Sequence, residues 1–289
     1  MITAAQREVK SKSPSFKQTI EKRLPDDRVV LITGTSSGIG KLTAVLLAGQ
    51  GFTVFGTSRK ASGGKQDGVE MLRLDITSDE SVTTCVSNLL QKTGRIDVLV
   101  NNAGQAFTGG LEETSLEEAK AQFDSNFFGA VRMVNAVLPG MRKRRNGQII
   151  NIASLAGTFP IPFGGYYGAA KVALMVYSEV LRQELKKLGV KVSVIEPGFF
   201  NTNHTRLSAA RSISDYDEIR KRAQSADEES FNKGGDPQEV ARTILKIIQS
   251  HSPKLHYVVG KEKRYVLLKR IMPDSIMESQ TRKHWRLNG

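Results

Sequence analysis

The sequence has little of several features that would assign it to a particular class of protein. It contains one cysteine, Cys85, among 289 residues, so an internal disulfide is excluded and a reducing compartment is favoured. No stretch approaches the roughly 20 apolar residues that a membrane-spanning helix needs. Residues 1–27 lack the apolar run of a secretory signal. These absences predict a globular, cytoplasmic protein in which Cys85 is a small buried side chain.

The chain also has fewer acidic than basic residues. The chain has 42 Lys and Arg against 29 Asp and Glu, a formal net charge of +13, which attracts anions such as nucleic acid, anionic lipid or a phosphorylated cofactor. We expect no nucleic-acid partner, because the sequence contains no recognised binding module and no basic stripe interleaved with aromatic residues. The basic run 142–145 is typical of a solvated helix C-terminus. The basic tail could form an amphipathic surface, so peripheral membrane contact stays open.

Short β-rich segments alternate with longer helical patterns along most of the chain. This alternation predicts parallel strands joined by helical crossovers in one α/β domain. Thr77 with Glu80, and Ser115 with Glu118, have the spacing of capping boxes, and Gly189 is expected to end a helix. A first helix is expected at about 38–50. The predicted strands are 29–33, 52–55, 71–74, 98–100, 149–152, 190–195 and 255–259.

The predicted domain organisation has one core with two extensions. Residues 1–27 form a flexible N-terminal extension, 28–260 the core domain, and 261–289 a basic C-terminal extension. Within the core, about residues 200–235 are polar with few apolar anchors, and we interpret them as a mobile substrate lid. A disordered surface insertion is the alternative, because composition alone supports both.

A glycine-rich segment, residues 33–40, directly follows the first predicted strand and opens the first predicted helix. In that context glycine permits a tight turn and close approach of a pyrophosphate to the helix N-terminus. The segment predicts a dinucleotide site. Its candidate contacts are Gly34, Ser36, Ser37, Gly38, Ile39 and Gly40.

The end of the second predicted strand indicates which dinucleotide binds. A carboxylate there would hydrogen-bond a ribose 2′-hydroxyl, but residues 56–60 hold hydroxyls and two cations instead. Ser58 and Arg59 therefore predict a 2′-phosphate site and NADP(H) as the cofactor, with an ordinary polar turn as the alternative. Asp75 is expected either to accept a hydrogen bond from adenine or to begin a helix cap. Asn102, Ala103 and Gly104 follow the fourth predicted strand, where small residues let a cofactor approach.

Tyr167 and Lys171 lie four residues apart on a predicted helix, so both side chains occupy the same face. A nearby ammonium lowers the pKa of a phenol, which otherwise starts near 10. Tyr166 fails this spacing test. Ser154 lies thirteen residues before Tyr167. The set predicts nicotinamide-dependent carbonyl chemistry.

With these motifs in order, the chain resembles the short-chain dehydrogenase/reductase family over about residues 28–260. The resemblance implies a doubly wound Rossmann domain on a seven-stranded parallel sheet, and hydride transfer between nicotinamide C4 and a carbonyl or alcohol. It implies that Ser154 hydrogen-bonds the substrate carbonyl, Tyr167 exchanges the proton, and Lys171 holds the nicotinamide ribose while lowering the Tyr167 pKa. Asn126 would anchor a proton-relaying water. Pro197, Gly198 and Thr202 would border the nicotinamide amide.

The substrate is less clearly indicated by the sequence. Phe159, Ile161, Phe163, Phe199 and Phe200 flank the catalytic positions and predict an apolar pocket, with loop-to-core packing as the alternative. The hypothesis is an NADPH-dependent reductase of a lipophilic ketone or aldehyde, such as a steroid or retinoid. A β-ketoacyl thioester reductase and a non-catalytic NADPH-sensing protein are the alternatives. The resemblance also implies a homodimer or homotetramer, formed through helices near 116–138 and 167–188.

Overall fold

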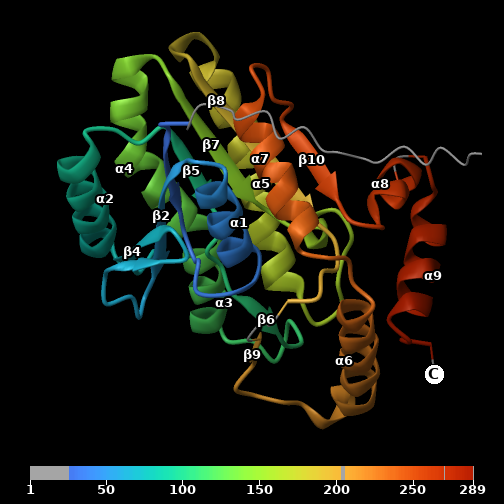
Figure 1. Cartoon of the computed structure of the whole chain (residues 1–289). Helices are drawn as coiled ribbons and strands as arrows, with labels where there is room; N and C mark the ends of the chain where they lie inside the picture. Colours follow the sequence, from blue (N-terminus) through green and yellow to red (C-terminus); the bar gives the residue numbers. More distant parts are fainter. Residues whose placement is uncertain (1–25, 203–205, 270, 289) are drawn as a thin grey trace, which may run out of the picture.

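The structure is a computed structural model, and it describes residues 26–202, 206–269 and 271–288. Within these residues the centre of the molecule is an eight-stranded sheet in the order β10-β8-β7-β5-β1-β2-β4-β3 (Figure 1). All neighbouring strands are parallel except the edge pair β3–β4. The strands are β1 (Val29–Ile32), β2 (Thr53–Ser58), β3 (Lys65–Gln66), β4 (Val69–Arg73), β5 (Val98–Asn101), β7 (Gly147–Ile152), β8 (Val190–Pro197) and β10 (His256–Val259). The seven predicted parallel strands are confirmed, and the two-residue β3 is an addition.

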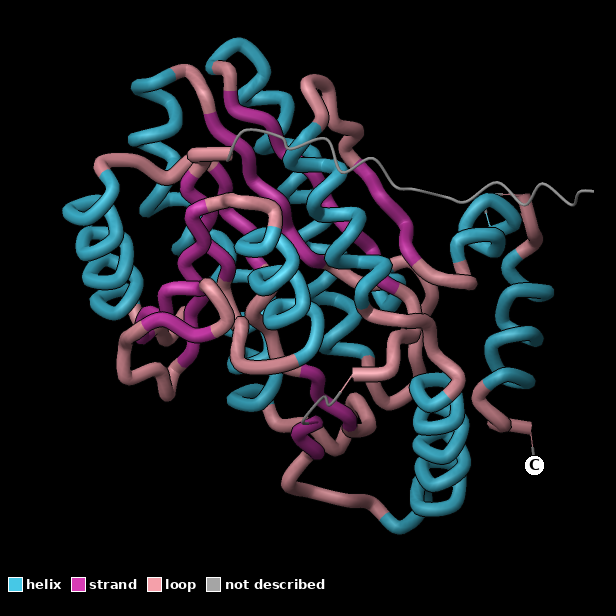
Figure 2. Tube along the Cα trace, in the orientation of Figure 1, coloured by secondary structure: helices cyan, strands magenta, loops and turns pink. Residues whose placement is uncertain are grey.

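Helices cover both faces of this sheet, as Figure 2 shows. Consecutive residues of β1 therefore enter different cores: Leu31 packs with α2, α4 and α5, whereas Ile32 packs with α1 and α7. Burial on both faces explains why the strands are apolar throughout rather than alternating. The helices are α1 (Gly38–Gly49), α2 (Asp79–Thr93), α4 (Gly129–Arg144), α5 (Gly165–Leu185) and α7 (Gln238–Gln249). The predicted doubly wound α/β fold is confirmed.

Two of the three predicted helix boundaries are confirmed. Ser115 and Glu118 form the capping box that begins α3 (Leu116–Phe123). Gly189, at φ +74°, ends the short 3₁₀ turn that follows α5. The capping box at Thr77 is wrong, because Ser78 caps α2 by accepting a hydrogen bond from the Ser81 N–H. The Thr77 hydroxyl donates instead to the Asp75 carboxylate, at 2.7 Å.

Several further elements gather beyond the carboxyl ends of the parallel strands (Figure 1). They include a small parallel sheet of β6 (Ala106–Thr108) and β9 (Arg206–Ser208), and the helices α6 (Asp217–Asn232), α8 (Lys263–Lys269) and α9 (Asp274–His284). The predicted lid, about 200–235, thus contains β9 and α6, and residues 203–205 lie outside the described residues. Its mobility stays a prediction. Residues 1–25 of the predicted N-terminal extension also lie outside the described residues.

The structure also bears on two sequence expectations, the burial of Cys85 and the lack of a membrane-spanning helix. Cys85 lies on the buried face of α2 and is 3% exposed, and burial raises the pKa of its thiol to about 11, so it is the small buried side chain that was predicted. None of the helices in the described part of the chain is both long enough and apolar enough to cross a membrane.

Candidate active site

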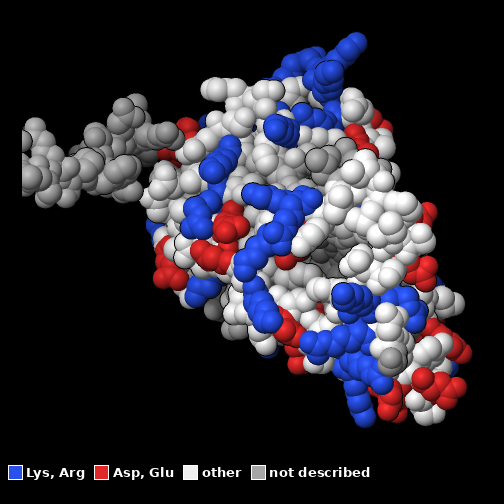
Figure 3. All heavy atoms as spheres, turned by 90° about the vertical axis from the view of Figure 1, so that its right-hand side faces the viewer, with Lys and Arg blue, Asp and Glu red and all other residues white. Residues whose placement is uncertain are grey.

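A single cavity of about 1630 Å³ lies at the carboxyl edge of the sheet. It extends from the glycine-rich turn after β1, past Tyr167 and Ser154, to α6, α8 and α9. Figure 3 shows the surface hollowed on the side of the molecule that carries the C-terminal helices. Pockets for one small ligand usually measure about 300–1,000 Å³. This cavity is therefore large enough for a dinucleotide and a second molecule together.

The glycine turn brings the N-terminus of α1 to one end of the cavity. A Cβ atom at Gly40 would lie 2.2 Å from the Gly34 carbonyl oxygen, so only glycine lets the helix start so close to the turn. Ser37, at the N-cap of α1, makes no side-chain capping hydrogen bond. The first N–H groups of the helix are thus left to an anion, and the helix dipole favours negative charge there. This geometry fits the pyrophosphate of a dinucleotide.

Asn102 joins the glycine turn to the end of β5. Its amide group donates to the carbonyl oxygens of Thr33 (2.9 Å) and Gly34 (3.0 Å). The Thr33 hydroxyl in turn accepts hydrogen bonds from the N–H groups of Asn102 (3.0 Å) and Ala103 (2.9 Å). A Cβ atom at Gly104 would lie 2.6 Å from Asn126 Oδ1. The small residues after β5 are therefore required by a compact, cross-linked cavity floor.

The carboxyl end of β2 also borders the part of the cavity that begins at the glycine turn. Thr57, Ser58, Arg59 and Lys60 all line it, and no carboxylate stands among them. Asp75 lines the cavity too, and hydrogen bonds from the backbone and hydroxyl of Thr77 hold its pKa below the usual value. Asp75 therefore fixes the turn before α2 while it faces the space predicted for adenine.

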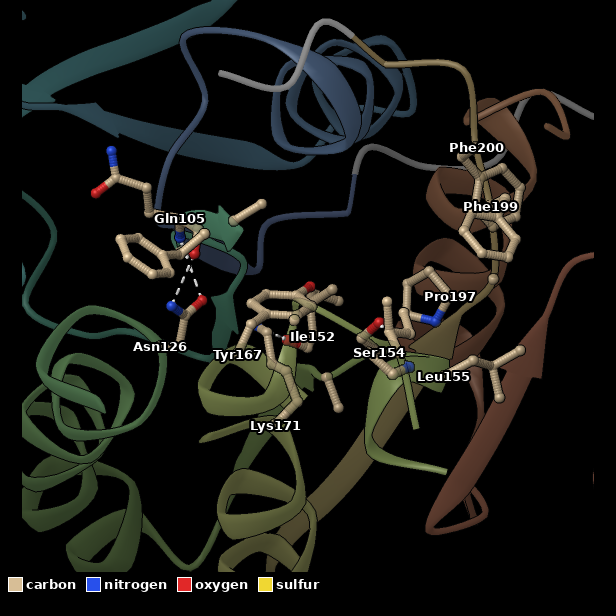
Figure 4. A pocket seen from close by; sticks show the side chains of 18 of the residues that line it. Gln105, Asn126, Ile152, Ser154, Leu155, Tyr167, Lys171, Pro197, Phe199 and Phe200 are labelled. Atoms are coloured by element: carbon tan, nitrogen blue, oxygen red, sulfur yellow. Dashed lines mark hydrogen bonds between the residues drawn. The ribbon is translucent and has the colours of Figure 1, made fainter. Parts of the chain in front are cut away.

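Tyr167 and Lys171 lie on one face of α5, and Ser154 lies across from them on the loop after β7 (Figure 4). The Lys171 ammonium is 5.7 Å from the centre of the Tyr167 ring and donates to the Ile152 carbonyl oxygen at 3.0 Å. Lys171 is 4% exposed, and burial lowers its pKa to about 8. The Ser154 hydroxyl accepts the Ala156 N–H at 3.1 Å, which leaves its own proton to donate.

Asn126 lies in a π-helical turn, Asp124–Phe128, between α3 and α4. Single π-helical turns are frequent at functional sites. Its side chain is 2% exposed, donates to the Gln105 carbonyl oxygen at 2.9 Å and accepts the Gln105 N–H at 3.2 Å (Figure 4). The amide also donates to the Gln122 carbonyl oxygen at 3.1 Å. These bonds fix Asn126 beside Gly104 at the cavity wall.

The structure brings nearly all the predicted site residues to this one cavity. The predicted positions in the glycine turn, after β2, at Asp75, after β5 and after β8, together with Asn126, Ser154, Tyr167 and Lys171, all line it. Thr202 is not among the lining residues; its hydroxyl donates to the Phe200 carbonyl oxygen at 3.4 Å. Thr202 nevertheless lies next to the turn, 3.7 Å from where a Cβ atom at Gly38 would stand.

The five predicted apolar residues also line the cavity. Phe200 has both predicted roles. It lines the cavity, and it also packs into the core beside α7, where it is 2% exposed. Phe163 has φ +60°, an uncommon value for a bulky residue, and its carbonyl oxygen accepts the Gly109 N–H at 2.7 Å. The loop that follows Ser154 is thus held in a particular conformation over the cavity.

The sequence interpretation missed the contribution of the C-terminal extension. Residues of α8 and α9 form the far wall of the cavity, together with α6. Trp285 is 4% exposed, and its ring centre is 6.3 Å from that of Phe199. The available signal was an apolar residue at every fourth position, in Leu268, Met272 and Ile276, ahead of the single tryptophan. The lining residues from this region include Tyr265, Leu268, Met272, Ile276, Met277 and Trp285.

Contacts between distant segments hold this wall in place. Lys269 donates to the Thr158 carbonyl oxygen, and its ammonium is 5.5 Å from the centre of the Phe159 ring. Arg286 pairs with Glu229 of α6. The C-terminal helices are therefore tied both to the loop after Ser154 and to the predicted lid.

Comparison with known proteins agrees with this geometry. The chain matches the short chain dehydrogenase family over residues 28–212. It is 40% identical over 259 residues to a 3-ketodihydrosphingosine reductase of Bacteroides thetaiotaomicron, covering 87% of this chain and 95% of that protein. It is 38% identical over 251 residues to retinol dehydrogenase 8 of Homo sapiens, covering 79% and 80% respectively.

Solved structures agree as well. A short-chain dehydrogenase from Streptomyces avermitilis superposes with a TM-score of 0.77 at 30% identity, covering 90% of this chain and 96% of that one. The closed form of serine dehydrogenase complexed with NADP⁺ superposes with a TM-score of 0.68 at 27% identity, covering 80% and 94%. Because the family match includes both the glycine turn and the Tyr167–Lys171 pair, and a 40% identical relative aligns over almost its whole length, this chain belongs to the short-chain dehydrogenase family.

Proposed function

We propose that the protein is an NADP(H)-dependent oxidoreductase that reduces a carbonyl group on a long-chain lipophilic molecule, with the reverse alcohol oxidation also available. One observation carries this proposal. A single cavity runs from the glycine turn, past Tyr167 and Ser154, to a wall formed by α6, α8 and α9 that includes the apolar side chains of Phe231, Leu268 and Ile276. Cofactor and lipophilic substrate can therefore meet end to end at the two hydroxyl groups.

The residues around the first half of the cavity fit a dinucleotide with a 2′-phosphate. The uncapped N-terminus of α1 suits the pyrophosphate, and Ser58 and Arg59 suit the 2′-phosphate because they offer a hydroxyl and a planar fork of donors. A carboxylate at the end of β2, which would repel that phosphate, is absent from Thr57 to Lys60. The solved relative in complex with NADP⁺ supports the same cofactor.

Ser154, Tyr167 and Lys171 would then act on the substrate oxygen. When bound, the nicotinamide supplies or accepts the hydride. The substrate oxygen gains negative charge during reduction, so donors directed at it lower the barrier. Ser154 donates its remaining proton to that oxygen, and Tyr167 transfers its phenolic proton to it. Lys171 is largely charged at pH 7, since its pKa is about 8, and its positive charge favours the phenolate that remains on Tyr167.

Asn126 has a supporting role in this scheme. Its hydrogen bonds to Gln105 hold the segment after β5 against the π-helical turn, next to Lys171. We assign to this position a water that relays protons between Lys171 and solvent, as the family resemblance implies. The relay would return a proton to Tyr167 after each turnover.

The substrate class follows from the walls of the second half of the cavity. Aromatic, leucine, isoleucine and methionine side chains from the loop after Ser154, from α8 and from α9 form one part of its lining, beside polar residues of α6 such as Gln224, Asp227 and Ser230. An alkyl chain gains free energy by leaving water against the apolar part. The relatives named for 3-ketodihydrosphingosine and for retinol support a long, mostly apolar substrate. A long-chain ketone is therefore the preferred substrate.

Self-association is part of the proposal. Val172, Val176 and Val180 are 41%, 53% and 51% exposed and lie four residues apart on α5, with Phe128 exposed on the neighbouring π-helical turn. An apolar stripe of this kind is typical of a protein interface. We propose that α4 and α5 pair with a second copy in a homodimer or homotetramer. The cytoplasmic location stays a prediction.

A substrate screen tests the proposed activity. The purified protein is mixed with NADPH, or with NADH in parallel, and the loss of nicotinamide absorbance is followed with 3-ketodihydrosphingosine, a steroid ketone, a β-ketoacyl thioester and a short water-soluble ketone. Retinol is tested with NADP⁺ in the oxidative direction. We expect NADPH and the long-chain ketone to give the highest kcat/KM. A preference for the thioester would favour the alternative enzyme, and tight NADPH binding without turnover of any carbonyl would favour the sensing protein.

A further inference from the structure

The rim of the cavity on the C-terminal side carries exposed apolar side chains. Tyr265, Leu268 and Ile276 line the cavity, yet they are 45%, 41% and 46% exposed, so they stand at its opening. Ile271, between α8 and α9, is 78% exposed, the highest value among the exposed large apolar side chains of the described residues. These four residues are called the apolar rim below. Ile271 does not line the cavity, so its exposure has no role in binding a substrate that lies inside it.

Cations surround the apolar rim. Lys233, Lys261 and Arg264 are exposed and also line the cavity, and the exposed Lys263 adjoins them. Figure 3 shows Lys and Arg side chains gathered beside the hollow. Residues 261–289 hold eight basic residues (Lys261, Lys263, Arg264, Lys269, Arg270, Arg282, Lys283 and Arg286) against three acidic ones (Glu262, Asp274 and Glu278), a net charge of +5. The C-terminal side of the opening thus carries an excess of positive charge; Lys233 and Arg286 pair with Glu229, and Glu262 lines the cavity.

We propose that the apolar rim and its cations dock the protein on the surface of an anionic lipid bilayer, with the cavity opening toward the membrane. Apolar side chains among cations on a short helical segment are typical of interfacial binding, in which the side chains enter the acyl boundary and the cations meet the headgroups. Each Lys or Arg near an anionic surface contributes about 1 kcal/mol, or roughly a fivefold gain in partitioning. A lipophilic molecule then passes into the cavity without crossing water.

A second copy of the chain is a poorer occupant of this surface. A twofold interface places the same patch on both sides, so the rim cations of one copy would face those of the other. The stripe on α5 lies over a face of the sheet, whereas α8 and α9 lie beyond its carboxyl edge (Figure 1). Self-association and membrane docking are therefore assigned to different faces.

Vesicle flotation of the full-length protein tests docking without any turnover, so its outcome is independent of the proposed activity. We expect the protein to float with phosphatidylcholine vesicles that contain phosphatidylglycerol, weakly or not at all with phosphatidylcholine alone, and less at high salt. Ile271→Asp should lower partitioning at least about tenfold, because it removes an inserted side chain and adds a repelled charge. Lys263→Glu should lower it by about tenfold or more through charge alone. Neither residue lines the cavity, so turnover of a short soluble ketone should be unchanged.

Matched control variants carry the same kinds of substitution, apolar to Asp and Lys to Glu, at exposed positions outside the apolar rim. Leu116→Asp alters a 67% exposed leucine at the start of α3, and Lys143→Glu alters an exposed lysine near the end of α4. Both should float like the wild type. Docking is overturned if the wild type does not float with anionic vesicles at low salt, or if the controls lose partitioning as much as the rim variants do. It is also overturned if Ile271→Asp breaks an oligomer in the absence of vesicles, because the rim would then be covered by a second copy.

Discussion

The two halves of the cavity are built in different ways. The cofactor half is made of backbone turns at the ends of β1, β2 and β5, cross-linked by Asn102 and Thr33. The substrate half is made of side chains from a loop, from α6 and from two helices at the C-terminus. Its elements are held by contacts across long stretches of sequence, such as that from Lys269 to Thr158, 111 residues apart.

This difference determines which residues of the cavity can be substituted and which cannot. A turn whose atoms approach within van der Waals distance tolerates almost no change, as the space beside Gly40 shows. An apolar wall accepts many side chains of similar volume, since hydrophobic contacts are not directional. The cofactor half should therefore respond sharply to single substitutions, and the substrate half gradually.

The largest effect is expected where the two halves meet. Tyr167→Phe removes the phenolic proton but keeps the aromatic ring beside Lys171, so kcat should fall by about 10³-fold or more while the NADPH dissociation constant changes little. Steady-state kinetics and cofactor fluorescence titration measure the two quantities. Tyr166→Phe, next door and outside the cavity lining, is the matched control and should keep its activity. Equal losses of kcat in both variants would contradict the assignment of Tyr167 as the residue that transfers the proton.

The second effect concerns stability rather than turnover. Lys171 is buried, with a pKa lowered from 10.5 to about 8, so below pH 8 the folded protein holds a proton on an unfavourably placed ammonium. Between pH 8 and 10.5 the unfolded chain binds more protons than the folded one, so stability rises with pH. The shift corresponds to about 3 kcal/mol, and the bond to Ile152 offsets about 1 kcal/mol. Lys171→Met should therefore abolish turnover yet stabilise the cofactor-free protein by about 2 kcal/mol at pH 7.

Denaturant unfolding across this pH range measures the gain. The advantage of Lys171→Met over the wild type should shrink between pH 8 and 10.5, as the wild-type lysine loses its proton. Lys246→Met, at an exposed position on α7, is the control and should keep the wild-type pH profile. A stability difference that does not vary with pH would show that packing, not charge burial, separates the variants.

The third effect tests the adenosine end of the cofactor half. Arg59→Ala should raise the KM for NADPH by about 10- to 100-fold, because a charge-assisted hydrogen bond contributes about 1.5–3 kcal/mol. The KM for NADH should change little, since NADH has no 2′-phosphate, and it is the internal control. An equal increase for both cofactors would mean that Arg59 supports the turn instead.

The features that could be predicted from the sequence lie mainly in the sheet and the cofactor half of the cavity, and those that could not lie mainly in the substrate half. The seven parallel strands, the glycine turn and the Tyr167–Lys171 spacing were predictable because each depends on residues within one strand, turn or helix. The cap of α2 was misplaced by one residue, since Thr77 and Ser78 both suit an N-cap and only tertiary structure shows that Thr77 bonds Asp75.

The wall formed by α8 and α9 could not be placed by such reasoning. Apolar spacing in residues 261–289 is compatible with an amphipathic surface, as predicted, and equally with a cavity wall. What decides between them is the packing of Trp285 beside Phe199 and of Lys269 over Phe159, contacts that no local pattern encodes. The two helices line the cavity, and Ile271 in the turn between them is exposed, so the same segment can carry both roles, as the proposed membrane docking requires.

The smallest effect probes how the lid region is attached to the substrate half. The Glu113 carboxylate accepts hydrogen bonds from the N–H groups of Gly110 (2.9 Å) and Ile213 (2.8 Å) and pairs with Arg220 of α6 at 2.5 Å. Burial raises its pKa, but these hydrogen bonds and the guanidinium outweigh burial and leave the pKa below 4.5. This attachment is therefore complete above pH 4.5 and is lost as the pH falls through the folded-state pKa.

Glu113→Gln replaces one acceptor oxygen by an N–H₂ group that faces donors, so the segment from β9 to α6 should open more often. We expect the substrate KM to rise by about threefold to tenfold, the cost of one or two weakened hydrogen bonds, with NADPH affinity unchanged. Hydrogen exchange of α6 should increase in the variant at pH 7, and in the wild type only below pH 4.5. Glu112→Gln, on the exposed neighbour that accepts from the Tyr216 hydroxyl, should have a smaller effect. If the two variants behave alike, the lid is held by the apolar packing of Phe231 against Phe199, and the substrate half is even less dependent on single polar contacts than proposed.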